Sequence, residues 1–275
     1  MRRAFQLPIR FNLVIATGAL ALGVFVSLVF EGRCDALSLA VVWILTWQIY
    51  TLDRVIKQPE DKLTQRRSVE ELVFMQKRAK LFKALLVASM IAELVLFAFR
   101  PFATIGVVLG IGGGLMYSLK IPLIGVRVKQ IPMIKSVYVP AILVGYCFLT
   151  PWVFPSTAEH WVILALLLVA FGINVSLFDL RDAGRDKSAG IITVANFLGE
   201  KGLLIGLWPL SLVAAGVPLI WWRTPEMIAA SAGVLAVALS SLRLWKPAPS
   251  WWYTIFIDGT MIVPALVYLA IRRAF

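Results

Sequence analysis

Apolar residues occur along the chain in long runs, and charged residues are largely confined to the stretches between them. A transmembrane helix needs about 20 consecutive apolar residues. Nine runs reach or approach that length, at about residues 12–30, 36–52, 82–99, 102–119, 136–150, 160–178, 203–221, 227–242 and 252–271. The pattern predicts an all-α, polytopic membrane protein with about nine transmembrane helices, forming a single transmembrane domain over residues 1–275.

Composition and charge support this prediction and suggest an orientation. Hydrophobic residues make up 60% of the 275 residues and charged residues only 15%. On the side of the N-terminus the loops hold 22 Lys and Arg residues, against 5 on the other side. Because basic loops remain in the cytoplasm, we expect a cytoplasmic N-terminus, in a bacterial inner membrane. Topology and anionic lipid then explain the net charge of +12, and no nucleic-acid partner is expected.

The longer loops all lie on the predicted cytoplasmic side. Loops 53–81, 120–135 and 179–202 are expected to form a cap over a central cavity that is open to this side. Ser68, with Glu71 three residues later, marks the start of a predicted amphipathic helix in the first loop. The outer loops are short and leave little room for a site.

Three aspartates occur together in DLRDAGRDKSAG, residues 179–190, where the sixth apolar run ends. If the helix continues, Asp179, Asp182 and Asp186 point within roughly 60° of one another, and their like charges repel unless cations compensate them. Arg181 and Arg185 are expected to point largely the other way round the helix. This favours a bound cation over a solvated charge cluster, and oxygen ligands without His or Cys suit Mg²⁺ shared with a substrate phosphate.

A second acidic group follows the second apolar run, in WQIYTLDRVIKQPED, which contains Asp53 and Asp61. The loop between the fourth and fifth runs is basic, and its side chains are candidates to bind phosphate charge that a metal leaves uncovered. Its cations are Lys120, Arg127, Lys129 and Lys135. Acidic and basic groups on one side of the membrane together predict a phosphorylated ligand.

Three further features of the apolar runs have a functional or structural interpretation. Glu93 and Asp258 lie within runs, where carboxylates are costly enough to suggest function, and Asp258 is expected to face the cavity about two turns in. The GIGGG stretch at 110–114 interrupts a run and predicts close helix packing rather than nucleotide binding. Cys34 and Cys147 are expected at different depths, so they form neither a disulfide nor a metal pair.

Over nearly its whole length the chain resembles the UbiA superfamily of intramembrane prenyltransferases. The segment DLRDAGRDKSAGIITVANFLG is similar to the family's second aspartate motif, in which Gly-x-x-Thr and Leu-Gly follow, here Gly190, Thr193, Leu198 and Gly199. The segment MYSLKIPLIGVRVKQIPMIKSVYVPAILVG is similar to the stretch joining the fourth and fifth helices, including Tyr117, Ser118 and Lys135. In the first motif, Asn-Asp-x-x-Asp-x-x-x-Asp, the middle aspartate matches Asp53, and the other positions are Ile49, Tyr50 and Lys57.

The resemblance implies an enzyme that ionises an isoprenoid diphosphate with Mg²⁺ and transfers the prenyl group to a lipophilic, by expectation aromatic, acceptor. It implies that the catalytic and metal-binding residues are Asp53, Asp179, Asp182 and Asp186. Diphosphate contacts are expected from Arg54, Lys129 and Lys135. Aromatic faces that can stabilise a carbocation are expected from Tyr50, Tyr117, Trp43 and Trp47.

Three alternatives remain open from the sequence. A terpene cyclase on the same scaffold would let the substrate's own alkenes capture the cation. A transporter or lipid-binding protein would use Glu93 and Asp258. A non-catalytic homologue would explain why only Asp53 of the first motif's three aspartates is present.

Overall fold

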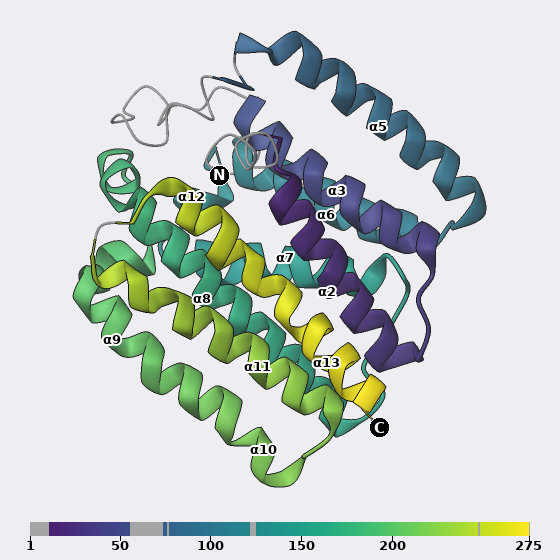
Figure 1. Cartoon of the computed structure of the whole chain (residues 1–275). Coiled ribbons are helices and arrows are strands. Elements are labelled where there is room, and N and C mark those ends of the chain that lie inside the picture. The colour runs from purple at the N-terminus through teal and green to yellow at the C-terminus, as the bar shows by residue number, and fades with distance from the viewer. Residues whose placement is uncertain (1–10, 56–73, 76, 122–124, 247, 275) are drawn as a thin grey trace.

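The computed structural model describes residues 11–55, 74–75, 77–121, 125–246 and 248–274, which form a bundle of long helices (Figure 1). The main helices are α2 (Leu13–Glu31), α3 (Ala36–Val55), α5 (Ala79–Phe99), α6 (Ala103–Ser118), α7 (Lys135–Leu149), α8 (Ala158–Ser188), α9 (Val194–Gly216), α11 (Pro225–Ser240) and α13 (Val263–Ala274). Shorter helical segments are η2 (Val128–Gln130), α10 (Pro218–Trp221), η3 (Ser241–Trp245), α12 (Ser250–Trp252), η4 (Tyr253–Ile257) and η5 (Asp258–Ile262). The all-α prediction is confirmed for this part of the chain.

Each of the nine predicted membrane segments corresponds to one helix or to a series of consecutive helical elements. Seven of these segments are apolar and long enough to cross a membrane among the described residues. The other two, α6 and α7, are apolar but have only 16 and 15 residues. Ser68 and Glu71, at the start of the predicted amphipathic helix, lie outside the described residues, as do Lys57 and Asp61.

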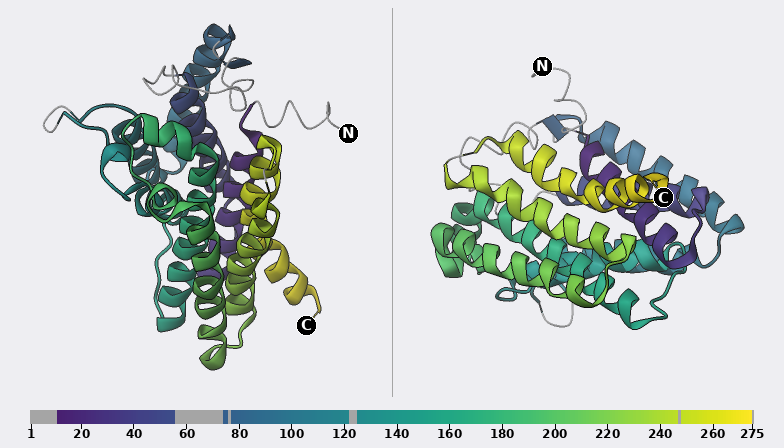
Figure 2. Two further views of the ribbon diagram at one scale, coloured as in Figure 1. Left: turned by 90° about the vertical axis from the view of Figure 1, so that its left-hand side faces the viewer. Right: turned by 60° about the horizontal axis from the view of Figure 1, so that its bottom comes forward.

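The helices run side by side, and successive helices reverse direction (Figure 2). The start of α2 and the end of α13 consequently lie at opposite ends of the bundle (Figure 1). We call the end at which α3, α6 and α8 finish and α7, α9 and α12 begin the charged end. It contains the aspartates of residues 179–186 and the basic loop before α7.

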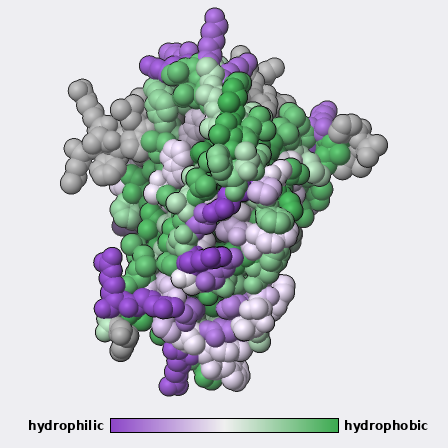
Figure 3. Space-filling view, turned by 90° about the vertical axis from the view of Figure 1, so that its right-hand side faces the viewer, coloured by the Kyte–Doolittle hydropathy of each residue, from purple (hydrophilic) through white to green (hydrophobic). Residues whose placement is uncertain are grey.

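The outside of the bundle is apolar, as a lipid-facing surface requires. Hydrophobic residues cover much of the face in Figure 3, and hydrophilic residues lie along its top edge and in its lower half. Helix α5 exposes large apolar side chains such as Val87, Ile91 and Leu94, and packs on α3 through Phe82 and Leu86. These features identify the chain as an integral membrane protein.

Glycines in α6 allow close helix approach, which confirms the interpretation of the GIGGG stretch. A Cβ atom on Gly110 would lie 2.7 Å from Leu45 of α3, and one on Gly113 would lie 2.7 Å from Ile142 of α7. Because there is no room for a side chain at either position, glycine lets α6 pack directly against both neighbours.

Candidate functional site

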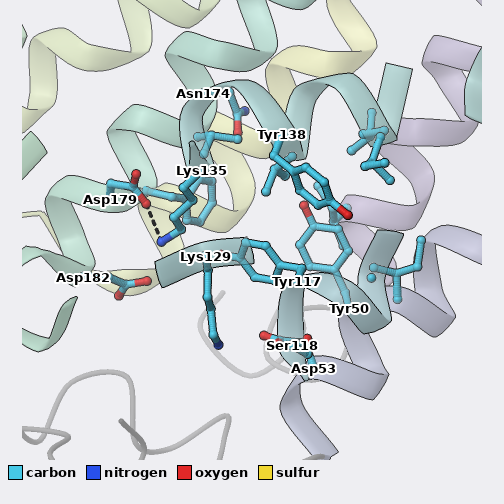
Figure 4. Close-up of a pocket in the computed structure, with 18 of the residues that line it drawn as sticks. Tyr50, Asp53, Tyr117, Ser118, Lys129, Lys135, Tyr138, Asn174, Asp179 and Asp182 are labelled. Atoms are coloured by element: carbon cyan, nitrogen blue, oxygen red, sulfur yellow. Dashed lines mark hydrogen bonds and ion pairs between the residues drawn. The ribbon is translucent and has the colours of Figure 1, made fainter. Parts of the chain in front are cut away.

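A cavity of about 270 Å³ lies toward the charged end, between α2, α3, α6, α7, α8 and the segment formed by α12, η4 and η5. Nine of the residues that the sequence put forward for catalysis, metal or substrate line it, namely Tyr50, Asp53, Arg54, Tyr117, Lys129, Lys135, Asp179, Asp182 and Asp186. Lys120 and Arg127, which were also candidates to bind phosphate, are not among the lining residues. They come from four separate stretches of the chain, and Figure 4 shows most of them around one space. Folding therefore brings both acidic groups and the basic loop to one place.

Helix α8 positions the three clustered aspartates because it continues well past the apolar run. Asp179, Asp182 and Asp186 are 0%, 9% and 3% exposed, so all three face inward, as their spacing predicted. The helix ends at Ser188, and Gly190, two residues later, has a φ of 71°, in the left-handed region that favours glycine. Thr193 then caps α9, and its hydroxyl accepts a hydrogen bond from the Asn196 backbone N–H at 3.2 Å.

The Gly-x-x-Thr part of the motif therefore has a local structural role. It ends one helix and begins the next within a few residues, and so fixes where Asp186 points. The backbone carbonyl of Asp186 accepts a hydrogen bond from the Ile191 N–H at 2.8 Å. Asn196 reinforces the turn by donating from its side chain to the Ile191 carbonyl at 3.1 Å.

Lys135, the first residue of α7, lies between two of the three carboxylates. Its Nζ is 2.5 Å from Asp179 Oδ1 (Figure 4). The same Nζ is 3.2 Å from Asp186 Oδ2. The ammonium thus compensates two buried negative charges that would otherwise repel each other. The backbone N–H of Met133, two residues earlier, donates to the Ile192 carbonyl at 2.8 Å and ties the basic loop to the turn after α8.

The third carboxylate corrects an expectation from the sequence. Arg181 and Arg185 were expected to point away from the aspartates, but each places Nη2 3.0 Å from Asp182 Oδ2. Arg181 also donates from Nε to Asp182 Oδ1 at 3.0 Å. A long arginine side chain can curve round the helix, and burial of Asp182 makes such pairing favourable.

The wall of the cavity opposite α8 carries Asp53 of α3 and two further cationic side chains, Lys129 and Arg54. Ser118 donates to Asp53 Oδ1 at 2.6 Å, which links the last turns of α3 and α6. Lys129, in the short helix η2, is 6% exposed, and its Nζ lies 5.4 Å from the ring centroid of Tyr117. Arg54 follows Asp53 on α3 and also lines the cavity.

Aromatic and apolar side chains form the rest of the wall. Tyr50 and Tyr117 line it, as expected, and Tyr138 stacks on Tyr117 with ring centroids 6.4 Å apart (Figure 4). Trp43 and Trp47 are not among the residues that line the cavity, which corrects their proposed role. Both pack in the cluster between α3 and α5, where Trp47 Nε1 donates to the Phe11 carbonyl at 2.9 Å.

The sequence reasoning missed several lining residues, among them Tyr138, Asn174, Phe178, Arg181 and Arg185. Helical spacing offered a signal for two of them. Tyr138 lies three residues after Lys135 on α7, and Phe178 lies four residues before Asp182 on α8. Positions three or four apart share a helix face.

The carboxylates of Asp179, Asp182, Asp186 and Asp53 fit Mg²⁺ that is bound together with a phosphorylated ligand. Among the described residues, no three Asp, Glu, His or Cys side chains are grouped closely enough to hold a metal ion by themselves. Both carboxylate oxygens of Asp179 are nevertheless buried, and the ammonium of Lys135, 2.5 Å from Oδ1, lies close enough to compensate their charge. Mg²⁺ typically takes one or two protein carboxylates and completes its coordination with water and phosphate.

Two solved structures share this arrangement of helices over almost the whole chain. One is the apo structure of a UbiA homologue from Aeropyrum pernix K1, with a TM-score of 0.64, 14% identity, and coverage of 96% of this chain and 99% of that chain. The other is a UbiA homologue from Archaeoglobus fulgidus, bound to DMAPP and Mg²⁺, with a TM-score of 0.62, 16% identity and the same coverage of 96% and 99%. No family model and no curated protein sequence matches the chain. The chain has the UbiA-like membrane fold, as the resemblance in its motifs implied.

Proposed function

We propose that the protein is a Mg²⁺-dependent membrane prenyltransferase, which ionises an isoprenoid diphosphate and transfers its prenyl group to a lipophilic acceptor. The observation that supports this proposal most strongly is the lining of the cavity. Five carboxylates and five cations line it, and they meet a wall of tyrosines and aliphatic side chains. A charged region for a diphosphate beside an apolar region for a prenyl chain matches the two parts of such a substrate. The UbiA-like fold supports the same class.

Each group in the cavity has a proposed task. Asp179, Asp182 and Asp186, with Asp53 across the cavity, would hold the metal. When bound, Mg²⁺ supplies positive charge that stabilises the departing diphosphate. Lys129, Lys135 and Arg54 bind diphosphate oxygens, and their charges offset those that develop as the C–O bond breaks and its electron pair leaves with the diphosphate.

The apolar walls would protect the carbocation that ionisation leaves. The rings of Tyr50 and Tyr117 line the cavity beside the charged residues, where their faces can stabilise a cation. Burial excludes water, so the acceptor rather than water captures the prenyl group. We further propose that the charged end faces the cytoplasm, with loops 53–81, 120–135 and 179–202 as its cap.

The proposal is tested by diphosphate release from C10, C15 and C20 prenyl diphosphates, using purified protein with Mg²⁺ or with EDTA. We expect release with Mg²⁺, none with EDTA, and at least a hundredfold loss in Asp182→Ala and Asp186→Ala, which remove charged groups at the reacting bond. Glu93→Gln is the matched control, because Glu93 is also buried but is not among the cavity-lining residues.

The products separate the alternatives. A prenylated acceptor supports a transferase, whereas hydrocarbon or alcohol formed without an acceptor identifies a cyclase. If wild-type protein releases no diphosphate from any chain length, with or without aromatic acceptors, the proposal is wrong and a non-catalytic homologue or transporter is favoured.

A further inference from the structure

Lys135 and the proposed metal need the same two carboxylates. The Lys135 ammonium is 2.5 Å from Asp179 Oδ1 and 3.2 Å from Asp186 Oδ2, and we call these two residues the lysine-paired carboxylates. Both are buried. A metal ion that contacted both carboxylates would lie where the ammonium lies, and two cations so close together repel each other. Lys135 and Mg²⁺ are therefore alternative occupants of this position.

The lysine-paired carboxylates are two of the five carboxylates that line the cavity. Asp182 is compensated from within its own helix, because Arg181 and Arg185 each place Nη2 3.0 Å from its Oδ2. Asp258 also lines the cavity, as its position in the sequence predicted, but it belongs to the last membrane segment. Lys135, in contrast, reaches α8 from the first turn of α7. A change in its side chain therefore alters the ion pairs of α8 without breaking those of the arginines.

The side chain of Lys135 can change partner while its backbone stays in place. The hydrogen bond from the Met133 N–H to the Ile192 carbonyl, at 2.8 Å, holds the chain before α7 against the turn after α8. The lysine side chain lines the cavity and is 15% exposed. Because lysine carries its ammonium on a flexible four-carbon stem, rotation of this stem can turn the charge from α8 toward a ligand in the cavity.

A diphosphate is the partner that such a rotation would find. Lys129 and Arg54 line the wall opposite α8, and a diphosphate held between the two walls would bring oxygen acceptors to the Lys135 ammonium. An ammonium displaced without this ligand would lose its ion pairs in a largely buried place, which is costly. Displacement of Lys135 by a metal is therefore favourable only when a diphosphate binds with the metal.

We propose that Lys135 makes Mg²⁺ binding depend on the diphosphate, because its ammonium competes with the metal for the lysine-paired carboxylates unless a diphosphate offers it another partner. This inference rests on the proposed function for the identity of the two ligands. The competition between Lys135 and the metal rests on the ion pairs alone, so it is measurable without turnover.

The test is calorimetric titration of Mg²⁺ alone into the full-length purified protein, at neutral pH and with a detergent-only reference. Lys135→Met removes the competing ammonium, so we expect this variant to bind Mg²⁺ at least about tenfold more tightly than wild-type protein. Lys187→Met removes a positive charge from an exposed position of α8 and should bind Mg²⁺ as wild-type protein does. Addition of Asp179→Asn to Lys135→Met should abolish the gain, because the metal would lose one of the two carboxylates.

Thermal melting shows whether each variant is folded. Lys135→Gln, which is also uncharged but keeps a hydrogen-bond donor, replaces Lys135→Met if the latter is not folded. If Mg²⁺ bound poorly to wild-type protein only for lack of phosphate oxygens, removal of the ammonium would not improve its binding. Equal or weaker Mg²⁺ binding by the folded lysine variant therefore overturns the inference, as does an equal gain in Lys187→Met.

Diphosphate release from C10, C15 and C20 prenyl diphosphates is measured on the same wild-type preparation. Tighter Mg²⁺ binding by the lysine variant, without release by wild-type protein, keeps the competition and refutes the proposed function. Release by wild-type protein with an unchanged Mg²⁺ affinity in the variant does the reverse.

Discussion

At the scale of single residues, the most consequential side chain is Lys135. Its ammonium is the cation that Asp179 and Asp186 share, and its side chain is only 15% exposed. Neither the metal-binding interpretation nor the charge-cluster interpretation of the sequence included this contact. The pairing explains how two buried carboxylates coexist when no metal compensates them.

The first prediction concerns Lys135→Met, which keeps the length of the side chain and removes its charge. Because removal of one partner leaves buried charges uncompensated, we expect a loss of about 3 kcal/mol in stability, seen as a lower thermal midpoint. Added Mg²⁺ should stabilise this variant more than wild-type protein, since it would replace the missing cation. Lys187→Met, at an exposed position of the same helix as the aspartates, is the control. Equal midpoints for the two variants would contradict the prediction.

The second prediction concerns an ion pair at the opposite end of the bundle. Asp35 caps α3 by accepting from the Ser38 backbone N–H at 3.1 Å, and Arg100 donates to its two oxygens at 2.7 and 2.8 Å. These arginine hydrogen bonds hold the pKa of Asp35 well below its usual range. In the folded protein the carboxyl is therefore harder to protonate than in the unfolded chain, whose pKa is about 3.9.

The sign of the pH dependence follows. The contribution of Asp35 is fully present above its unfolded pKa and is lost progressively as the pH falls below about 4. Thermal midpoints of wild-type protein and Asp35→Asn should differ at pH 7, and the difference should shrink at pH 4 and further at pH 3. A difference that is constant across this range would show that the pair does not act through its charge.

The sequence could predict that Asp179, Asp182 and Asp186 face the same side of α8, because residues at this spacing share a face of any helix. It could not predict which side chains pair with them. Whether Arg181 curves toward Asp182 depends on the rotamers of long side chains, which the surrounding helices determine. The same limit explains Trp47: its position near a membrane interface was readable, but the direction of its ring depends on how α3 is rotated against α5.

At the scale of elements, the apolar runs predicted that the helices would form. They did not predict where the helices end or where they are interrupted. Helix α8 continues to Ser188 because its charged residues pair with one another and with Lys135, beyond the apolar part. The last segment is divided into α12, η4, η5 and α13, although its sequence is one apolar run. The break depends on contacts from Asn174 and α2, which are distant in sequence.

The third prediction compares two glycines of α6. A Cβ on Gly106 would lie 2.3 Å from Thr150 Oγ1 and 2.8 Å from the Thr150 backbone nitrogen, whereas one on Gly112 would meet no atom within 4 Å. Gly106→Ala should therefore force α6 away from α7 and cost about 1–3 kcal/mol. Gly112→Ala should be neutral or stabilise by up to about 1 kcal/mol, because alanine is the better helix former. Thermal midpoints test both, and the reverse order would refute the packing argument.

At the scale of the whole molecule, the alternation of helices places all four chain stretches of the site at one end. Helices α3, α6 and α8 finish there, and α7 begins there, so residues more than 100 positions apart in the sequence share one cavity. The number and order of membrane segments therefore determined much of the site. The contact between α8 and the last membrane segment, in which Asn174 donates to the Ile257 carbonyl, required the three-dimensional arrangement, because nothing in the sequence pairs these two residues.

The last prediction tests the orientation of this arrangement in the membrane. Cys34, a free and exposed thiol, lies between α2 and α3 at the end opposite the charged end, whereas Cys147 is buried. If the charged end faces the cytoplasm, a membrane-impermeant maleimide should label wild-type protein in intact cells, and Cys34→Ser should abolish labelling. In the Cys34→Ser background, Lys187→Cys introduces a thiol at an exposed position of the charged end. That variant should react only after the cells are permeabilised. The opposite pattern, with Lys187→Cys labelled in intact cells and Cys34 protected, would contradict the orientation inferred from the 22 to 5 distribution of basic residues. The proposed diphosphate site would then lie outside the cell.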